Sequence, residues 1–379
     1  MSIHTEPQTA SQSAGPFSLS ISEDQRQMLE PVRRFARERL QPLLNEAATE
    51  VRRQEARQTA QHLGLASAML SERQGGLGIQ PFELCLLLEE LASGPLGLAA
   101  ELTISLPALA LSRDHEWLCR LLPQDSEALL AGQRALPLAV AAPSPKPTFA
   151  LLPRQAAGLL VLAPDGDGRW RLRWLDDVAL HDLVPPSAEA QVSEGLRLVR
   201  LPPAGEIHGT GFSATLPAGA CQSILVWQGL WLAGLLAGAA RAATAFAFSY
   251  AQTRVAFQRP IIHHQAVALK LADMAIATDA LRLQVWDVAT RLARPDRLPA
   301  GHFAAMARQV MGASLEIHRH AVQVCGGHGY VEGFPPARRF QDARVLGLML
   351  MELAQASAQE EAAFEEARGD AGVNRRVLV

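Results

Sequence analysis

The segment from Ile224 to Ala240 contains no charged residue over seventeen positions, and its one strongly polar side chain is Gln228. Such a run has two physical solutions, a helix across a bilayer or a helix enclosed by protein on every side. Seventeen residues lie at the short limit for a membrane span. Gly229, Gly234 and Gly238 fit close packing in either setting. Because amphipathic helical patterns flank the segment, we expect a buried helix in a helical bundle and no membrane span.

Helical patterns also begin the chain. Ser22 precedes Gln25 by three positions, which is the spacing of a capping box at a helix start. A second helix is expected over about 45–63, then a glycine turn over 71–78 and a further helix over 82–92, with helices continuing to about 134. In the third helix, three leucines followed by Glu89 and Glu90 predict a buried face and then a solvated one.

The pattern changes to short apolar runs and many prolines over 137–217. Residues 169–175 alternate strictly, with Trp170, Leu172 and Trp174 on one face, and the preceding PDGDGRW predicts a hairpin turn. The long apolar helix is expected over 222–257. Because it is apolar on more than one face, we expect the bundle around it to contain the oligomer interface.

The predicted fold class is therefore mainly α with a small β domain. The expected division is a disordered arm at 1–18, an N-terminal helical domain at 19–136, a reduced middle β domain at 137–217 and a C-terminal helical bundle at 218–379.

Composition excludes some functions. A formal net charge of -3 argues against a nucleic-acid binder that neutralises phosphates. The four cysteines form no CxxC pair, and the pairs His263/His264 and His318/His320 face different ways, so we expect no metal site and dispersed surface histidines. The polar first twenty residues lack a signal-peptide pattern, so we expect a cytoplasmic protein.

Common catalytic motifs are missing from the sequence, including GxSxG, GxGxxG after a strand, a Walker loop and HExxH. Residues 250–265 nevertheless stand out. If the helix continues through them, Tyr250, Arg254 and Phe257 lie at i, i+4 and i+7 and share one face. The forked guanidinium of Arg254 suits a phosphate group.

A second segment, residues 321–330, holds a glycine-rich turn. Gly326, Gly327 and Gly329 let backbone N–H groups approach an anion closely, and Gln323 offers an amide to an adenine or ribose edge.

These two segments, together with SERQGGLG before FELCLLLEEL, resemble the acyl-CoA dehydrogenase family, whose members carry YAxxRxxFGxxIxxxQ and QxxGGxGY. The resemblance covers about residues 20–367. It implies that these elements reach across a subunit interface and hold the pyrophosphate and adenine end of an FAD whose flavin lies in the neighbouring subunit. The matching cofactor-binding residues are Arg254, Phe257, Gln265, Gln323, Gly326 and Gly327. The family's glycine after Phe257 is Gln258 here.

The resemblance also implies α,β-desaturation of an acyl-CoA, with a glutamate base and an electron-transfer flavoprotein as acceptor. The base lies eight residues after the position of Asp342, or, in another branch, twenty-two residues before Tyr250. Those positions hold Leu350 and Gln228, and neither side chain accepts a proton near neutral pH. Glu352 is the remaining candidate, although on a helix it faces about 200° away from Leu350.

The flavin-binding segments of the family are also missing. Only the proline of TEPxxGSD is kept, near Ala141–Pro143, and no W[IV]TN segment exists. This one-sided pattern resembles the non-catalytic subunit of a heteromeric α2β2 bacterial acyl-CoA dehydrogenase, known in steroid side-chain degradation. Two alternatives stay open: an active homomeric enzyme with Glu352 as base, and a flavin-free scaffold protein. No motif indicates the acyl group.

Overall fold

The computed structural model describes residues 21–374, apart from gaps at 45–49, 115–127, 129–132, 142–147, 157, 166–168, 177–190, 194, 209–212, 217–219, 294–297, 300 and 332. The expected arm at 1–18 and most of the TEPxxGSD region lie outside the described residues.

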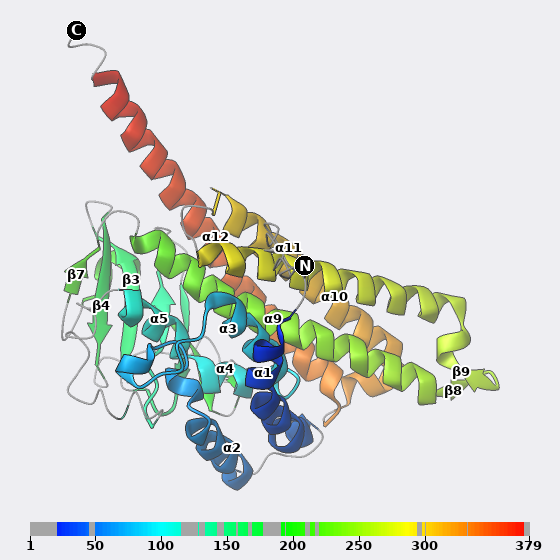
Figure 1. Cartoon of the computed structure of the whole chain (residues 1–379). Helices are drawn as coiled ribbons and strands as arrows, with labels where there is room; N and C mark the ends of the chain where they lie inside the picture. The colour runs from blue at the N-terminus through cyan, green and yellow to red at the C-terminus, as the bar shows by residue number, and fades with distance from the viewer. Residues whose placement is uncertain are drawn as a thin grey trace, which may run out of the picture.

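Helices precede and follow a small β region, so the predicted fold class is confirmed (Figure 1). The N-terminal helices are α1 (Glu23–Phe35), α2 (Glu50–His62), α3 (Pro81–Leu91), α4 (Leu96–Thr103) and α5 (Leu106–Asp114). The main strands are β1 (Leu138–Val140), β2 (Phe149–Pro153), β3 (Leu159–Pro164), β4 (Trp170–Leu175), β5 (Gln191–Ser193), β6 (Leu196–Arg200) and β7 (Ser213–Thr215). The C-terminal helices are α9 (Ala220–Thr253), α10 (Gln265–Leu292), α11 (His302–Cys325) and α12 (Pro335–Asn374).

The start of α1 has the predicted capping box. Ser22 Oγ accepts the N–H of Gln25 at 3.2 Å, and Gln25 Oε1 accepts the N–H of Ser22 at 3.0 Å. Each bond satisfies a backbone donor that the first helical turn leaves unpaired.

The β region consists of two sheets, ordered β1-β3-β4-β7 and β2-β6-β5. Strands β3 and β4 pair antiparallel, which confirms the predicted hairpin. Trp170, Leu172 and Trp174 are all buried, as their alternation predicted. This packing fixes β4 between β3 and β7.

Helix α9 lies at the centre of the molecule and packs against α3, α10, α11 and α12. Among the described residues, Cys221–Thr253 is the one helix apolar and long enough to cross a membrane, and 94% of its most apolar window is buried inside the protein. The enclosed-helix interpretation is confirmed. Close approach explains one glycine, because a Cβ at Gly238 would lie 2.6 Å from the Cα of Glu89.

The prediction that Glu89 is solvated is wrong, because the residue is only 1% exposed. Its carboxylate accepts Arg282 Nε at 2.8 Å and Trp286 Nε1 at 2.7 Å, both from α10. Burial raises the pKa of Glu89, while the charges of Arg282 and Arg241 oppose that rise. A charge can be buried here because two donors meet it. The contact ties α3 to the bundle.

Candidate cofactor site

Helix α9 ends earlier than the sequence predicted. Its last residue is Thr253, and a hairpin follows, formed by β8 (Val255–Ala256) and β9 (Arg259–Pro260). The prediction that Tyr250, Arg254 and Phe257 share one helix face is therefore wrong. The N–H of Arg254 still bonds to the Tyr250 carbonyl at 2.8 Å, but the chain turns directly after it.

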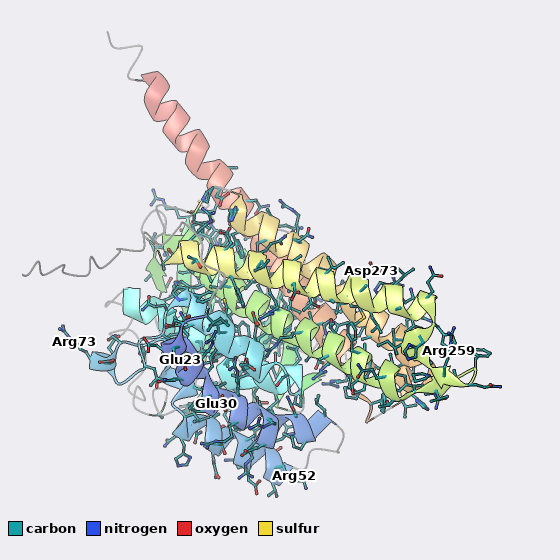
Figure 2. All side chains as sticks on the ribbon, turned by 45° about the vertical axis from the view of Figure 1, so that its right-hand side comes forward. Glu23, Glu30, Arg52, Arg73, Arg259 and Asp273 are labelled. Carbon is teal, nitrogen blue, oxygen red and sulfur yellow. The ribbon has the colours of Figure 1, made fainter. Side chains whose placement is uncertain are left out.

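The tip of this β8–β9 hairpin is Phe257-Gln258, and both residues have positive φ, 51° and 67°. Positive φ at both central positions is the geometry of a type I′ turn, which matches the twist of a two-residue hairpin. Figure 2 shows Arg259 at this extremity of the molecule. The turn exposes Phe257 almost fully, at 90%.

His264 braces the hairpin. Its Nε2 donates to the carbonyl oxygen of Ala256 at 3.1 Å, which leaves Nδ1 to accept Arg259 Nη2 at 3.3 Å. The Phe257 ring meets the His264 ring edge-on at 5.9 Å. The hairpin therefore has a fixed shape on the end of α9.

The glycine turn is a 3-10 helix, Gly326–Tyr330, at the end of α11. Gly329 is required inside the chain, because a Cβ there would lie 2.6 Å from the Val322 carbonyl oxygen. Gly326 has φ 58°, a conformation that favours glycine. Gly327 has neither constraint, and a Cβ there meets nothing within 4 Å. An open backbone at Gly327 suits close approach by a group from outside this chain.

Tyr250 joins the two segments. Its hydroxyl oxygen lies 2.9 Å from His328 Nδ1 and 3.3 Å from the Cys325 carbonyl oxygen. The end of α9 thus contacts the glycine turn. The bonded residues are seventy-five or more positions apart in the sequence.

All six predicted cofactor-binding residues are exposed: Arg254, Phe257, Gln265, Gln323, Gly326 and Gly327. Gln265 begins α10, and Gln323 lies in the last turn of α11. The six positions offer one guanidinium, two amides and open glycine backbone. Such a set binds a phosphate and hydrogen-bonds a polar ring edge.

The positions expected to hold a base are not arranged for proton transfer. Leu350 is 0% exposed within α12, which continues unbroken past it. Gln228 Nε2 donates to the Leu138 carbonyl oxygen at 3.2 Å, so α9 contacts β1 directly. Glu352 is half-buried, and burial raises its pKa.

Helix α12 also bonds to strand β4 and to the start of α9. Trp170 Nε1 donates to Glu360 at 2.6 Å, and Gln222 Nε2 donates to Ser357 at 2.7 Å and to Glu361 at 2.8 Å. These contacts were not predicted from the sequence, because about 135 residues or more separate the partners and no motif marks them.

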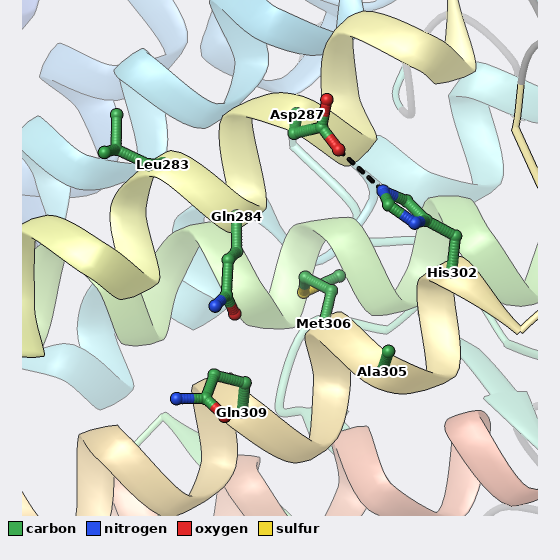
Figure 3. A pocket seen from close by; sticks show the side chains of 7 residues that line it. All are labelled: Leu283, Gln284, Asp287, His302, Ala305, Met306 and Gln309. Carbon is green, nitrogen blue, oxygen red and sulfur yellow. Dashed lines mark hydrogen bonds and ion pairs between the residues drawn. The ribbon is translucent and has the colours of Figure 1, made fainter.

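A separate groove of about 440 Å³ lies between α10 and α11 (Figure 3). Within it, His302 Nε2 lies 2.6 Å from Asp287 Oδ2, and Asp287 also forms an ion pair with Arg291 Nε at 2.9 Å. Burial would raise the pKa of Asp287, but hydrogen bonds from Arg291 and His302 outweigh it and lower that pKa. None of the predicted site residues lines the groove.

The histidines correct another expectation. His318 and His320 are 0% and 9% exposed, so they are core residues and not surface histidines. The described residues contain no group of His, Cys, Asp and Glu able to hold a metal ion.

Comparison with known proteins finds two family profiles that match separate parts of the chain. The profile "Acyl-CoA dehydrogenase, N-terminal domain" matches residues 22–113, and "Acyl-CoA dehydrogenase, C-terminal domain" matches residues 220–349. The mitochondrial short-chain specific acyl-CoA dehydrogenase of Bos taurus is 39% identical over 109 residues, which cover 28% of this chain and 26% of that protein. The chain thus spans about a quarter of the length of the curated relatives it matches.

Two solved structures extend the likeness over the whole fold. "PigA with FAD and proline" aligns with a TM-score of 0.72 at 16% identity, over 92% of this chain and 100% of that chain. The Tcur3481-Tcur3483 steroid ACAD aligns with a TM-score of 0.68 at 21% identity, over 92% and 99%. At these identities the likeness shows the fold alone.

Proposed function

Because the chain belongs to the acyl-CoA dehydrogenase family, we propose that it completes the FAD site of a catalytic partner in an FAD-dependent acyl-CoA dehydrogenase. One contrast carries the proposal. All six motif positions of the candidate cofactor site hold matching, exposed residues, whereas the two base positions hold Leu350 and Gln228.

The exposed cluster fits the pyrophosphate and adenine end of FAD. Arg254 would form charge-assisted hydrogen bonds to a phosphate, and the open backbone at Gly327 allows close approach. Gln265 and Gln323 would orient the adenine and ribose. When bound, FAD supplies the hydride acceptor for α,β-desaturation; this chain's residues bind and orient it.

The region of this chain that would hold its own flavin ring fits the cofactor less well. The Gln228 amide bonds directly to the backbone of β1, and Trp170 is bonded to Glu360. Both contacts join the β region to the helices, where the family holds its flavin ring and its base. Neither Leu350 nor Gln228 can remove an α proton. The catalytic glutamate therefore belongs to the partner subunit.

The proposed assembly is an α2β2 heterotetramer that takes an acyl-CoA as substrate and passes electrons to an electron-transfer flavoprotein. Steroid acyl-CoA degradation is the setting to test first, because the missing base and flavin segments resemble the non-catalytic subunits known there.

The test is flavin stoichiometry in the complex co-purified with its partner subunit. We expect one FAD per heterodimer, measured by absorbance after denaturation. Arg254→Ala should weaken FAD retention about ten- to a hundred-fold, because a charge-assisted bond to phosphate is lost. Arg308→Ala, an exposed arginine on α11 outside the cluster, is the matched control. Two FAD per heterodimer, or equal retention in both variants, would contradict the proposal.

A second candidate, an active homomeric enzyme, is favoured by the half-buried Glu352 with its raised pKa. A yellow homo-oligomer whose turnover disappears in Glu352→Gln would establish it. A colourless protein that binds no partner subunit would instead indicate a flavin-free scaffold.

A further inference from the structure

A cavity of about 480 Å³ lies where α1, α3, α9 and the start of α12 meet. Its polar lining includes Arg33, Arg241 and Arg339 with a single carboxylate, Glu90. These arginines are far apart in the sequence, so no motif signals the site. None of them belongs to the cofactor cluster described above.

The charges of the cavity do not balance. Glu90 accepts Arg33 Nε at 3.0 Å and Arg241 Nη2 at 3.0 Å, so one carboxylate faces two guanidinium groups. A third guanidinium, that of Arg339, adds to the excess. The acid that interacts with it, Asp342, forms an ion pair with Arg338 at 3.1 Å. The lining thus carries a surplus of positive charge.

Arg339 is the most informative residue. It is 4% exposed, its Nη2 donates to the Ser93 carbonyl oxygen, and its Nε has no hydrogen-bond partner among the described atoms. An unpaired donor on a buried cation is costly. An anion bound in the cavity would offset the positive charge of this guanidinium. Burial lowers the pKa of Arg339 to about 10, so the group is charged at neutral pH.

The lining also contains Gln41 and Ser93, whose side chains bond to each other at 3.1 Å, and an apolar part formed by Leu44, Ala242, Ala245, Phe246 and Pro335. The volume lies within the roughly 300–1,000 Å³ of small-molecule sites. We propose that this cavity binds a small organic anion, with a phosphate or carboxylate head on the three arginines and an apolar body against Leu44 and Phe246. The inference goes beyond the proposed function and does not depend on it.

The experiment is calorimetric titration of the full chain with octyl phosphate, octanoate, inorganic phosphate and 1-octanol. We expect saturable binding of at least one octyl anion, with inorganic phosphate and 1-octanol at least about ten-fold weaker because each lacks one half of the ligand. Tighter octyl phosphate would identify a phosphate ester; tighter octanoate would identify a carboxylic acid.

Variants then locate the binding. Arg33→Gln should weaken it about ten-fold through one lost charge-assisted bond, and Ala245→Trp should abolish it by filling the cavity. Both positions are partly or fully exposed, so these variants are expected to fold. Arg34→Gln, the exposed neighbour outside the cavity, is the control. Absence of saturable binding, or the same loss in Arg34→Gln, would overturn the proposal. A third result would also overturn it: the wild-type chain binds none of the four compounds, and Arg33→Gln releases a protein partner. In that case the cavity receives a carboxylate from another protein.

Discussion

Gln258 occupies a backbone conformation that suits glycine, with φ 67° at the tip of the β8–β9 hairpin. A side chain there crowds its own backbone, at a cost of about 1 kcal/mol. We expect Gln258→Gly to raise the free energy of unfolding by up to about 1 kcal/mol. The control is Gln252→Gly, in the last turn of α9, which should lower it by a similar amount. Chemical denaturation measures the free energy of unfolding of both variants. A change of the same sign in the two variants, relative to wild type, would contradict the prediction.

His318 should make stability depend on pH. Its Nδ1 donates to the Ser314 carbonyl oxygen at 2.7 Å, while burial lowers its pKa to about 4. The unfolded pKa is higher, about 6.5, so between these values the unfolded state binds more protons. Folding stability attributable to this group is therefore present above about pH 6.5 and lost towards pH 4.

The measurement compares unfolding free energies of wild type and His318→Leu from pH 7 to pH 4. Relative to the variant, wild type should lose roughly 3 kcal/mol, which follows from the pKa difference. A difference is needed because burial raises the pKa of Asp342 to about 7, and that group contributes the opposite slope in the same range. If the unfolding free energies of wild type and His318→Leu changed in parallel with pH, His318 would not titrate between pH 7 and pH 4.

Local rules predicted residues whose partners are near in sequence and failed where the partners are distant. The capping box at Ser22 depends on Gln25, three positions away, and was predicted correctly. Glu89 was predicted to be solvated, because its charge is visible in the sequence but its partners on α10 are not. The proposed cofactor-binding residues were selected by motif. Their surroundings were not, since the contact between Tyr250 and His328 exists only in three dimensions.

Among the elements, α9 shows how glycine permits close helix packing. A Cβ at Gly238 would lie 2.6 Å from the Glu89 Cα and carbonyl oxygen, which are backbone atoms that cannot move aside alone. Gly238→Ala should therefore lower the free energy of unfolding by about 1–3 kcal/mol through overpacking. Gly312→Ala on α11 should raise it by about 0.5–1 kcal/mol, because a Cβ there meets nothing. Thermal unfolding of the two variants gives the comparison, and a Gly238→Ala protein as stable as wild type would contradict the packing.

Element boundaries were harder to predict than element types. The central helix was expected to run to 257 but ends at Thr253. Residues 254–258 remain apolar enough to continue a helix, and no proline or glycine marks the stop. The hairpin forms because β8 pairs with β9 and because His264 bonds to Ala256. Such pairing outweighs local propensity and leaves little trace in the sequence.

For the whole molecule, the expected order of helices, β region and helices follows from the change in periodicity. The enclosed position of α9 follows from its uncharged run over residues 224–240. The arrangement of the arginine-lined cavity could not be predicted, because it depends on how α1, α3, α9 and α12 meet.

At this scale we expect the isolated chain, supplied with FAD, not to oxidise acyl-CoA thioesters. A positioned general base contributes about 10²–10⁴-fold to such reactions, and Leu350 contributes none. The assay uses a panel of acyl-CoA thioesters with a dye acceptor, and the complex with the partner subunit serves as positive control. Robust turnover by the single chain would contradict the subunit proposal.

The projecting hairpin has a thermal consequence. Phe257 is 90% exposed, and Tyr330, Val255 and Val331 are 73%, 56% and 54% exposed. If a second subunit covers these side chains, part of the adhesion between subunits is hydrophobic, and that contribution weakens on cooling. The association constant of such an assembly is lower at 4 °C than at 25 °C. Sedimentation at 4 °C and 25 °C should therefore show more free subunit at the lower temperature, and Phe257→Ser should reduce the difference.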